Sequence, residues 1–306
     1  MPLGIILKGI GGFYYVKEES SSKNIYECKL RGIFRKNSIT PLPGDKVVFS
    51  ILDEKEKLGS IDQILPRFSE LVRPAIANID QMVIVVSAKA PNTDFLLLDK
   101  LLITAEMKRL RAIICINKID LEDDVAKSIS DIYSLIGYDC IEISSIKNIG
   151  YELLQEKLKG HMNVFAGQSG VGKSTILNQI MDSWVMETGS VSIKIQRGKH
   201  TTRHAEILEL KYGGYIADTP GFSSFELVDI QYNELENYYP EFRRYLNSCK
   251  FTSCSHILEP ECPIREATEH GDINKDRFLR YVQIYKELKE IPLYKTKKPE
   301  SRRIIK

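Results

Sequence analysis

The chain has 306 residues, which is enough for two or three domains of ordinary size. Apolar residues make up 43% and charged residues 27%, a globular composition that excludes global disorder and collagen-like sequence. The net charge of +2 predicts no partner by itself, and no apolar run approaches the ~20 residues that a membrane-spanning helix needs.

The N-terminal region is predicted to be all β. Short β-rich runs occur over residues 5–7, 12–16, 25–30 and 46–51, with turn residues between them. About five short strands without helices indicate a small β-barrel over residues 1–67, for which an OB-fold is one candidate. Analogy with other OB-type barrels favours RNA contact, and the alternative is a barrel that serves only as a spacer.

A different pattern follows the predicted linker between Pro66 and Pro74. Strands are expected at 81–87, 111–116, 140–143 and 163–166, and helices at 94–108, at 151–159 and from about 172. Asp94 or Thr93 is expected to cap the first of these helices. Alternating strands and helices predict an α/β domain over residues 68–225, with a mostly parallel sheet covered on both faces.

The last part of the chain, residues 226–306, is predicted to be mainly helical. Helices are expected over 232–246 and 276–289, on either side of a cysteine cluster. The tail from Lys295 to Lys306 is basic. It is either an RNA contact or an ordinary solvated charge run.

The segment Asn117-Lys118-Ile119-Asp120 follows a predicted strand and has the N-K-x-D pattern. Guanine presents an N1–H and an amino group side by side, and one carboxylate can accept both. Adenine would leave Asp120 desolvated and unpaired, a mismatch that can discriminate by about 10⁴–10⁵-fold. Lys118 is expected over the base plane, and Asn117 is expected to tie this loop to the phosphate loop. The alternative is a solvated loop at a strand end.

Ser144 and Ser145 close the next predicted strand. They are candidates for a loop that supports guanine through its backbone.

Residues 167–174, Gly-Gln-Ser-Gly-Val-Gly-Lys-Ser, fit the phosphate-loop pattern G-x-x-x-x-G-K-[ST] between a predicted strand and a predicted helix. Its backbone N–H groups and the helix N-terminus favour phosphate oxygens. Lys173 is expected to reach the β- and γ-phosphates, and the Ser174 hydroxyl to ligate Mg²⁺. The predicted nucleotide-binding residues here are Gly167, Gln168, Ser169, Gly170, Val171, Gly172, Lys173, Ser174 and Thr175. The alternative is a glycine-rich turn without a ligand.

Two further polar segments are candidates for the γ-phosphate and Mg²⁺. Asp218-Thr219-Pro220-Gly221 ends an apolar run, where Asp218 would hold Mg²⁺ through water and the Gly221 N–H would face the γ-phosphate. Thr201 and Thr202 lie in a preceding polar loop, and one of them is expected to complete the Mg²⁺ shell. We favour Thr202, although the sequence does not choose between them. A plain Pro-Gly turn is the alternative for the first segment.

The order of these motifs is unusual. The N-K-x-D and serine segments precede the phosphate loop, and the threonine and D-T-P-G segments follow it. This order predicts a circular permutation of a Ras-like GTPase core, because a sheet depends on which strands are neighbours more than on where the chain begins. The segment after D-T-P-G leads directly into residues 226–306. Our hypothesis is that the GTP state is passed mechanically to that region.

The six cysteines fall into two groups. Cys28, Cys115 and Cys140 stand alone in apolar stretches and are expected to be buried free thiols. Cys249, Cys254, His256 and Cys262 give the spacing C-x4-C-x-H-x5-C, which predicts a closed, structural Zn²⁺ site. We expect no signal peptide and a reducing cytoplasmic location, where such a cluster favours metal over disulfides. The alternative is unrelated cysteines, and His270 lies outside the spacing.

Taken together, these motifs resemble the ribosome small subunit-dependent GTPase A (RsgA, or YjeQ) family of bacterial circularly permuted GTPases. The resemblance covers nearly the whole chain and implies late maturation of the small (30S) ribosomal subunit. It also implies binding of the immature particle near its decoding region, contact with 16S ribosomal RNA, release after GTP hydrolysis and a monomer off the ribosome. The chain has Ser144-Ser145-Ile146 where the family more usually has S-A-K.

The expected reaction is in-line attack of water on the γ-phosphoryl group, with Lys173, Mg²⁺ and backbone N–H groups neutralising charge. Phe222 follows Gly221, so the water-orienting Gln of Ras-type enzymes is absent, and we expect slow turnover until the ribosomal subunit completes the site. His200 is the in-chain candidate for orienting water, or else a surface histidine.

Basic residues of the barrel are the candidates for RNA phosphate contact: Lys29, Arg31, Arg35 and Lys36. Two competing functions are an RNA-binding module in which hydrolysis is incidental and a GTPase that serves translation or tRNA.

Overall fold

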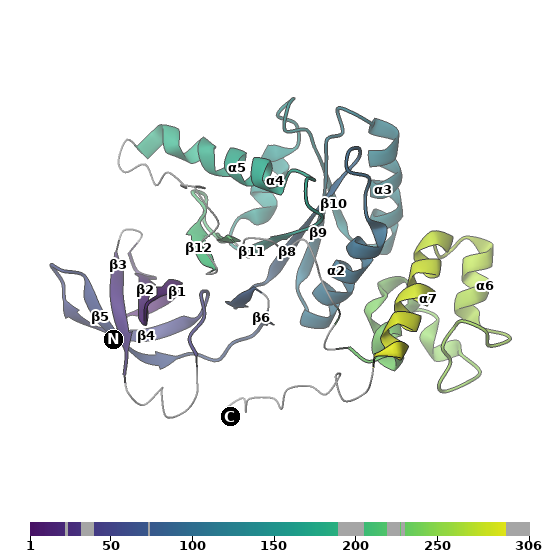
Figure 1. Cartoon of the computed structure of the whole chain (residues 1–306), viewed down its shortest axis with the longest axis horizontal. Coiled ribbons are helices and arrows are strands. Elements are labelled where there is room, and N and C mark those ends of the chain that lie inside the picture. The colour runs from purple at the N-terminus through teal and green to yellow at the C-terminus, as the bar shows by residue number, and fades with distance from the viewer. Residues whose placement is uncertain are drawn as a thin grey trace.

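The computed structural model describes residues 1–21, 24–31, 40–72, 74–188, 205–218, 227 and 230–291, with the backbone alone at 182–188 and 218. Figure 1 shows a β-barrel, then a central sheet with helices on both faces, then a small helical region. This arrangement confirms the predicted fold class. No helix in the described ranges is both long enough and apolar enough to cross a membrane.

Five strands close the N-terminal barrel in the order β1-β2-β3-β5-β4. They are β1 (Leu3–Ile10), β2 (Phe13–Glu18), β3 (Ile25–Leu30), β4 (Lys46–Asp53) and β5 (Leu58–Ile64). In β3, β4 and β5 buried residues alternate with more exposed ones, as the two-residue period of a strand predicts. The barrel core contains Ile6, Val16, Tyr26, Phe49 and Ile61, all fully buried.

The segment predicted to be a linker has structure of its own. Strands β6 (Glu70–Val72) and β7 (Ala75–Ala77) form a short antiparallel hairpin. Arg67 donates from Nε and Nη2 to the two carboxylate oxygens of the buried Asp45, both at 2.7 Å. This bidentate pair connects the linker to the barrel, and planar two-point pairing gives it a defined geometry.

The central sheet has six strands in the order β10-β9-β8-β11-β13-β12. They are β8 (Gln81–Ser87), β9 (Arg111–Asn117), β10 (Asp139–Ile143), β11 (Met162–Ala166), β12 (Glu206–Glu209) and β13 (Tyr215–Asp218). All neighbouring pairs are parallel except β12 with β13. The helices are α2 (Phe95–Lys108), α3 (Asp123–Ile136), α4 (Tyr151–Leu158) and α5 (Lys173–Thr188).

The middle strand shows how the core forms on both faces. Met82, Ile84 and Val86 of β8 pack in one apolar cluster with α2 and α3. Val83 and Val85 pack in a second cluster with α4 and α5. Every residue of β8 is buried, which is why its middle, Met82 to Val86, is a continuous apolar run and does not alternate.

The helical region differs in part from its prediction. The helix expected over 276–289 is α7 (Lys275–Glu290), and α6 (Pro263–His270) precedes it, with His270 exposed at its end. The helix expected over 232–246 is instead three 3₁₀ turns, η1 (Tyr232–Tyr238), η2 (Pro240–Phe242) and η3 (Leu246–Ser248). Pro240 explains the first break, because a proline disfavours helical backbone in the residue before it, and Tyr239 is extended.

A buried ion cluster joins the helical region to the central domain. Asp99 of α2 is fully buried and accepts from Arg277 and, at 2.5 Å, from Arg280 Nε, both on α7. The Tyr133 hydroxyl of α3 donates to the same carboxylate at 2.9 Å. Removing one member of such a cluster would leave an uncompensated charge in the interior and weaken the contact.

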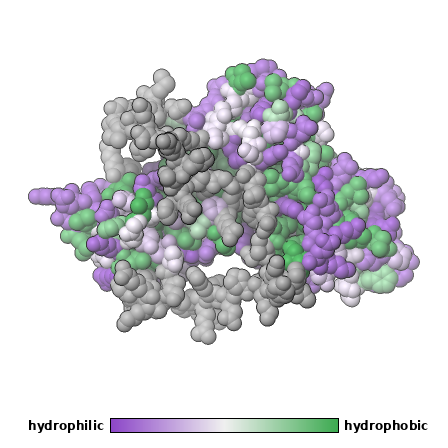
Figure 2. Space-filling view, viewed as in Figure 1, coloured by the Kyte–Doolittle hydropathy of each residue, from purple (hydrophilic) through white to green (hydrophobic). Residues whose placement is uncertain are grey.

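The barrel contacts the other end of the sheet, at edge strand β12. Lys8 of β1 pairs with Glu206 at 2.8 Å, and Lys17 of β2 pairs with Glu209. Figure 1 shows β12 on the side of the sheet that faces the barrel. On the face shown in Figure 2, polar residues cover much of the surface with apolar residues interspersed, as in ordinary globular proteins.

Candidate nucleotide and metal sites

The predicted phosphate loop joins the end of β11 to the start of α5. Gly167, Gly170 and Gly172 have positive φ angles of 134°, 83° and 101°, which side chains disfavour. A Cβ on Gly167 would lie 2.2 Å from the Val85 carbonyl oxygen, and one on Gly172 would lie 2.2 Å from Asn117 Nδ2. The glycines of the motif therefore allow both the turn and the close packing of neighbouring strands.

The lysine of the motif folds back across this loop. Lys173 Nζ donates to the carbonyl oxygens of Gly167 at 2.6 Å and Gln168 at 2.7 Å. Burial lowers the pKa of this ammonium below its usual range. Ser174 and Thr175 are exposed in the first turn of α5, where their hydroxyls are accessible to a ligand.

The N-K-x-D segment follows β9 and touches the phosphate loop. Asn117 is buried, and its Nδ2 donates to the Val171 carbonyl at 2.9 Å. Lys118 Nζ donates to the Gly170 carbonyl at 3.0 Å and to the Ala90 carbonyl. The structure thus places Asn117 between the two loops, as predicted for a residue that ties them together.

The serine pair completes this corner of the site. Ser144 Oγ donates to Asp120 Oδ1 at 2.5 Å and accepts from the Lys147 N–H at 3.1 Å. Ser145 Oγ lies 2.9 Å from the Tyr151 hydroxyl and 3.4 Å from Asn117 Oδ1. Sequence reasoning missed Tyr151, which extends the network that holds Asn117 and which only the fold brings near.

The segments predicted to face the γ-phosphate are described only in part. Asp218 is the last residue of β13, and Ala217 pairs with Val164 of β11, so Asp218 lies at the sheet edge where the phosphate loop begins. His200, Thr201, Thr202 and Gly221 lie outside the described residues. Their predicted roles stay predictions.

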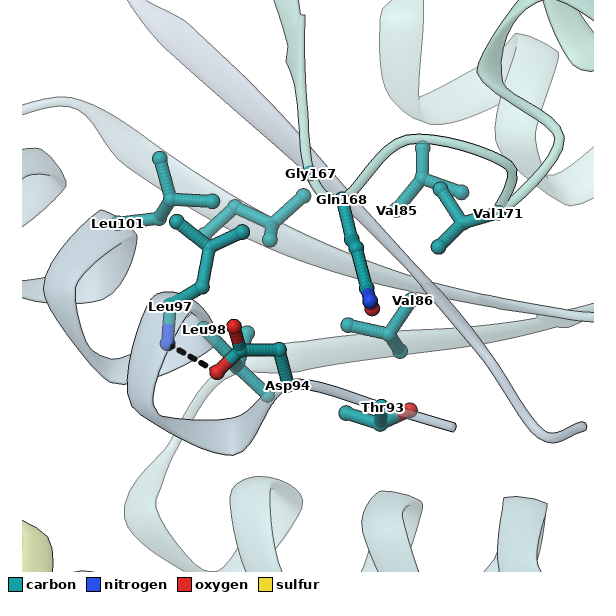
Figure 3. A pocket seen from close by; sticks show the side chains of 11 residues that line it. Val85, Val86, Thr93, Asp94, Leu97, Leu98, Leu101, Gly167, Gln168 and Val171 are labelled. Carbon is teal, nitrogen blue, oxygen red and sulfur yellow. Dashed lines mark hydrogen bonds between the residues drawn. The ribbon is translucent and has the colours of Figure 1, made fainter. Parts of the chain in front are cut away.

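A small hollow lies beside the phosphate loop, between β8 and α2. Figure 3 shows it lined by apolar side chains such as Val86 and Leu97, with Gln168 extending from the loop toward Asp94. Asp94 caps α2 by accepting from the Leu97 N–H at 2.9 Å, which settles the choice of cap in its favour. The lining offers too few polar groups for a nucleotide, and we treat the hollow as packing around the loop.

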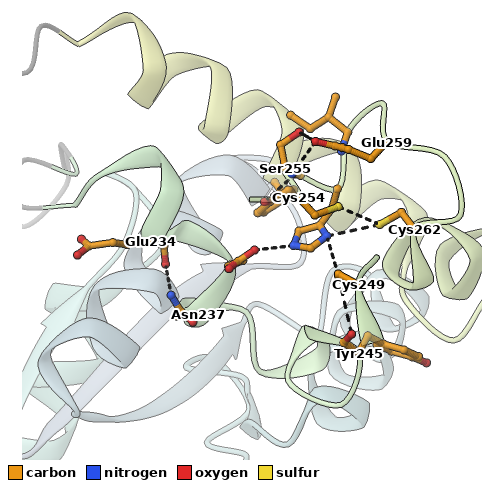
Figure 4. A network of polar contacts seen from close by, with 12 residues as sticks. Glu234, Asn237, Tyr245, Cys249, Cys254, Ser255, Glu259 and Cys262 are labelled. Atoms are coloured by element: carbon orange, nitrogen blue, oxygen red, sulfur yellow. Dashed lines mark hydrogen bonds and ion pairs between the residues drawn. The ribbon is translucent and has the colours of Figure 1, made fainter. Parts of the chain in front are cut away.

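The four predicted zinc ligands converge in the helical region (Figure 4). The ligand atoms of Cys249, Cys254 and His256 all lie within 4.8 Å of one another. Cys262 Sγ lies 3.9 Å from Cys254 Sγ and 3.4 Å from His256 Nδ1, and Cys249 Sγ lies 3.7 Å from the same nitrogen. Zn–S bonds of about 2.3 Å place tetrahedral ligands about 3.8 Å apart, so this donor set fits Zn²⁺.

One carboxylate shapes the loop that carries these ligands. Glu259 accepts from the N–H groups of Ser255, Ile257 and Leu258 at 2.7 to 3.1 Å, and from the Ser255 hydroxyl at 2.7 Å. Burial opposes its ionisation, but these donors outweigh burial and lower its pKa to about 2. Sequence reasoning missed Glu259, because a glutamate in a polar loop gives no signal of such a role.

The other three cysteines are free thiols. Cys28 and Cys115 are buried as expected, and Cys140 is half-buried. Burial raises the pKa of the Cys28 thiol to about 12, so this thiol is a packing group and a poor nucleophile.

Comparison with known proteins covers nearly the whole chain. The RsgA GTPase family model matches residues 64–228, and the RsgA N-terminal domain model matches residues 3–61. The chain is 70% identical over 306 residues, all of both chains, to the small ribosomal subunit biogenesis GTPase RsgA of Ruminiclostridium cellulolyticum. It is 44% identical to the protein of that name from Alkaliphilus metalliredigens, covering 95% of this chain and 99% of the relative.

Two solved structures are similar to this chain over nearly its whole length. The crystal structure of YjeQ from Thermotoga maritima superposes with a TM-score of 0.82 at 36% identity, covering 95% of this chain and 99% of that one. The structure of YloQ, described as a circularly permuted GTPase, superposes with a TM-score of 0.80 at 40% identity, covering 95% and 96%.

Proposed function

The chain belongs to the RsgA GTPase family, and from that membership we propose that it hydrolyses GTP to GDP and phosphate in the biogenesis of the small ribosomal subunit. The names of the relatives state both GTPase activity and biogenesis of the small ribosomal subunit. The structural observation that supports the proposal most is the Asn117–Val171 hydrogen bond, which joins a guanine-type loop to a phosphate loop 54 residues later in the chain.

Base selection would depend on Asp120. Its carboxylate would accept from the guanine N1–H and amino group, while the Ser144 hydroxyl holds one carboxylate oxygen in place. Lys118, fixed against the phosphate loop, would lie along the base plane. A site built to pair polar groups rejects a base that leaves them unpaired.

Phosphate chemistry would follow from positioning. The loop from Gly167 to Lys173 would surround the β- and γ-phosphates, with Lys173 exchanging its carbonyl partners for phosphate oxygens. Ser174 and Asp218, with Thr201 or Thr202, would hold Mg²⁺, which neutralises charge on the phosphates.

Hydrolysis needs a group that orients water. The Gly221 N–H would face the γ-phosphate, and His200 would orient the attacking water in place of the missing glutamine. With Phe222 after the glycine, turnover of the free protein would be slow, and binding to the ribosomal particle would complete the site. Replacement of His200 by alanine tests this role, since full subunit-stimulated turnover in the variant would reject it.

We further propose contact with 16S ribosomal RNA, a monomeric state off the ribosome, a cytoplasmic location and one structural Zn²⁺. Lys29 is an exposed barrel cation, with its Nζ 5.0 Å from the centre of the Phe13 ring. Arg31 is exposed but pairs with Asp62 at 2.7 Å, so it is a weaker candidate for phosphate contact. Arg35, Lys36 and the tail from Lys295 lie outside the described residues.

The test is GTP turnover of the full-length protein with and without purified small subunits, together with co-sedimentation with separated subunits. Strong stimulation by small subunits, and pelleting with them in the GTP-analogue state, would support the proposal. Binding without stimulated turnover would favour an RNA-binding module. Stimulation by large subunits or tRNA alone would favour a role in translation.

A further inference from the structure

An acidic side chain that is not one of the four proposed zinc ligands contacts the histidine among them. Glu236 Oε2 lies 2.6 Å from His256 Nε2. The imidazole is only 1% exposed, and its other nitrogen, Nδ1, faces the sulfurs of Cys249 and Cys262. The two ring nitrogens therefore have opposite surroundings, one a carboxylate and the other a group of thiols.

We propose that Glu236 is a positioning residue for the zinc site, which holds the proton of His256 on Nε2 so that the Nδ1 lone pair is free for the metal. This step rests on the zinc site proposed above. A neutral imidazole carries one proton, and the hydrogen bond that one nitrogen makes decides which nitrogen is protonated. A carboxylate accepts strongly from the Nε2–H, whereas a proton on Nδ1 would have to leave before zinc could bind.

The position of Glu236 in the chain gives the contact a second consequence. Glu236 lies on η1, 20 residues before His256, and η1 packs against α7 and α2 in the apolar core of the helical region. All four ligands come from residues 249–262, so the carboxylate is the polar tie from the imidazole to a separate segment. The buried rings of Phe242 and Tyr281 pack beside the histidine, with ring centres 6.1 and 6.4 Å from its own.

The experiment measures the zinc affinity of the full-length protein by competition with a chromophoric chelator. Glu236→Ala is expected to weaken zinc binding by about 10–100-fold, the usual effect of losing a carboxylate behind a ligating histidine. Glu236→Gln keeps an acceptor oxygen without the charge and should lose less. Glu269→Ala, which removes an exposed carboxylate from the same region, is the control and should bind zinc as the wild type does.

Two readouts separate positioning from a merely structural role: the protonation state of His256, and the difference in zinc affinity between the Ala and Gln variants. Nitrogen NMR of the zinc-loaded wild type should show His256 protonated at Nε2 and bound through Nδ1. Binding through Nε2, wild-type affinity in Glu236→Ala, or equal losses in the Ala and Gln variants would each overturn the proposal. A wild-type protein without zinc affinity would reject the zinc site itself, while the GTPase proposal would stand on its own turnover test.

Discussion

At the scale of single residues, the close approach of Gly172 and Asn117 shows what the predicted nucleotide site requires. The amide of Asn117 lies where a side chain at position 172 would begin. The same amide donates to the Val171 carbonyl, so a residue larger than glycine would displace the hydrogen bond that joins the two loops. The glycine is therefore needed for contact with a second motif as well as for its φ of 101°.

Gly172→Ala is expected to lower GTP affinity by at least about tenfold, because Asn117 and the phosphate loop cannot both keep their positions. Gly137→Ala is the matched control: its φ is 106°, but nothing lies within 4 Å of the added Cβ. It should cost about 1 kcal/mol of stability from backbone strain and leave GTP binding unchanged. Fluorescence titration with a labelled nucleotide measures the GTP affinity of the two variants, and thermal unfolding measures their stability. Equal GTP affinity in the two variants would contradict the prediction.

Asp120→Asn should weaken GTP binding by about 10²-fold or more and improve binding of xanthosine triphosphate, because the amide offers a donor where guanine also donates. Asp124→Asn, an exposed acid at the start of α3, is the control and should bind both nucleotides as the wild type does. Competition binding with the two nucleotides measures the change in relative affinity for GTP and xanthosine triphosphate. Unchanged GTP affinity in Asp120→Asn would reject its role.

At the scale of elements, most helices and strands follow from short-range patterns in the sequence, with one helix as an exception. The phosphate-loop glycines and the Asp94 cap follow from neighbouring residues, so they were predictable. Helix α3 was not predicted, although Ala126, Ile129 and Tyr133 show helical spacing and are buried. Glu236 gave no signal, because its partner His256 is 20 residues away and only tertiary packing brings them together.

Edge strand β10 offers a test of electrostatics within an element. Asp139 accepts from Arg111 of β9 at 2.6 Å and from Lys157 of α4 at 3.0 Å. Burial opposes its ionisation, but these two hydrogen bonds outweigh burial and hold the pKa of Asp139 below its usual value. A lowered pKa contributes stability above the unfolded-state value of about 3.8, and that contribution is lost as the pH falls below it.

We expect Asp139→Asn to lower the free energy of unfolding at neutral pH by less than about 1 kcal/mol, since the carboxylate is half-exposed. The difference from the wild type should shrink as the pH falls below about 3.8. Urea unfolding over a pH series measures it. A difference that stays constant with pH would show that the charge is not responsible.

At the scale of the whole molecule, the reordered motifs still meet at one edge of one sheet. Strands β9, β10 and β11 lie close together in that sheet, and at their carboxyl ends lie Asn117, Ser144 and the phosphate loop. The permutation also places the helical region directly after β13. Asp99, Arg277 and Arg280 give that region a second, buried connection to the central domain.

Because of these two connections, hydrogen exchange over residues 230–291 should differ between the GTP-analogue and GDP states. Arg280→Met should reduce the difference by loosening the contact with Asp99. Lys250→Met, which removes an exposed pair with Glu261, serves as the control and should preserve it. Identical exchange in the two nucleotide states of the wild type would show that the helical region does not respond to the nucleotide.

The contact between the barrel and β12 has one further consequence. An outermost strand carries unpaired backbone groups that invite another chain to join the sheet, and β1 and β2 approach β12 with Lys8 and Lys17. We therefore expect the barrel to hinder other chains from joining the sheet at its β12 edge. A fragment that starts at residue 68 should accordingly aggregate in light scattering at concentrations where the intact protein stays dispersed.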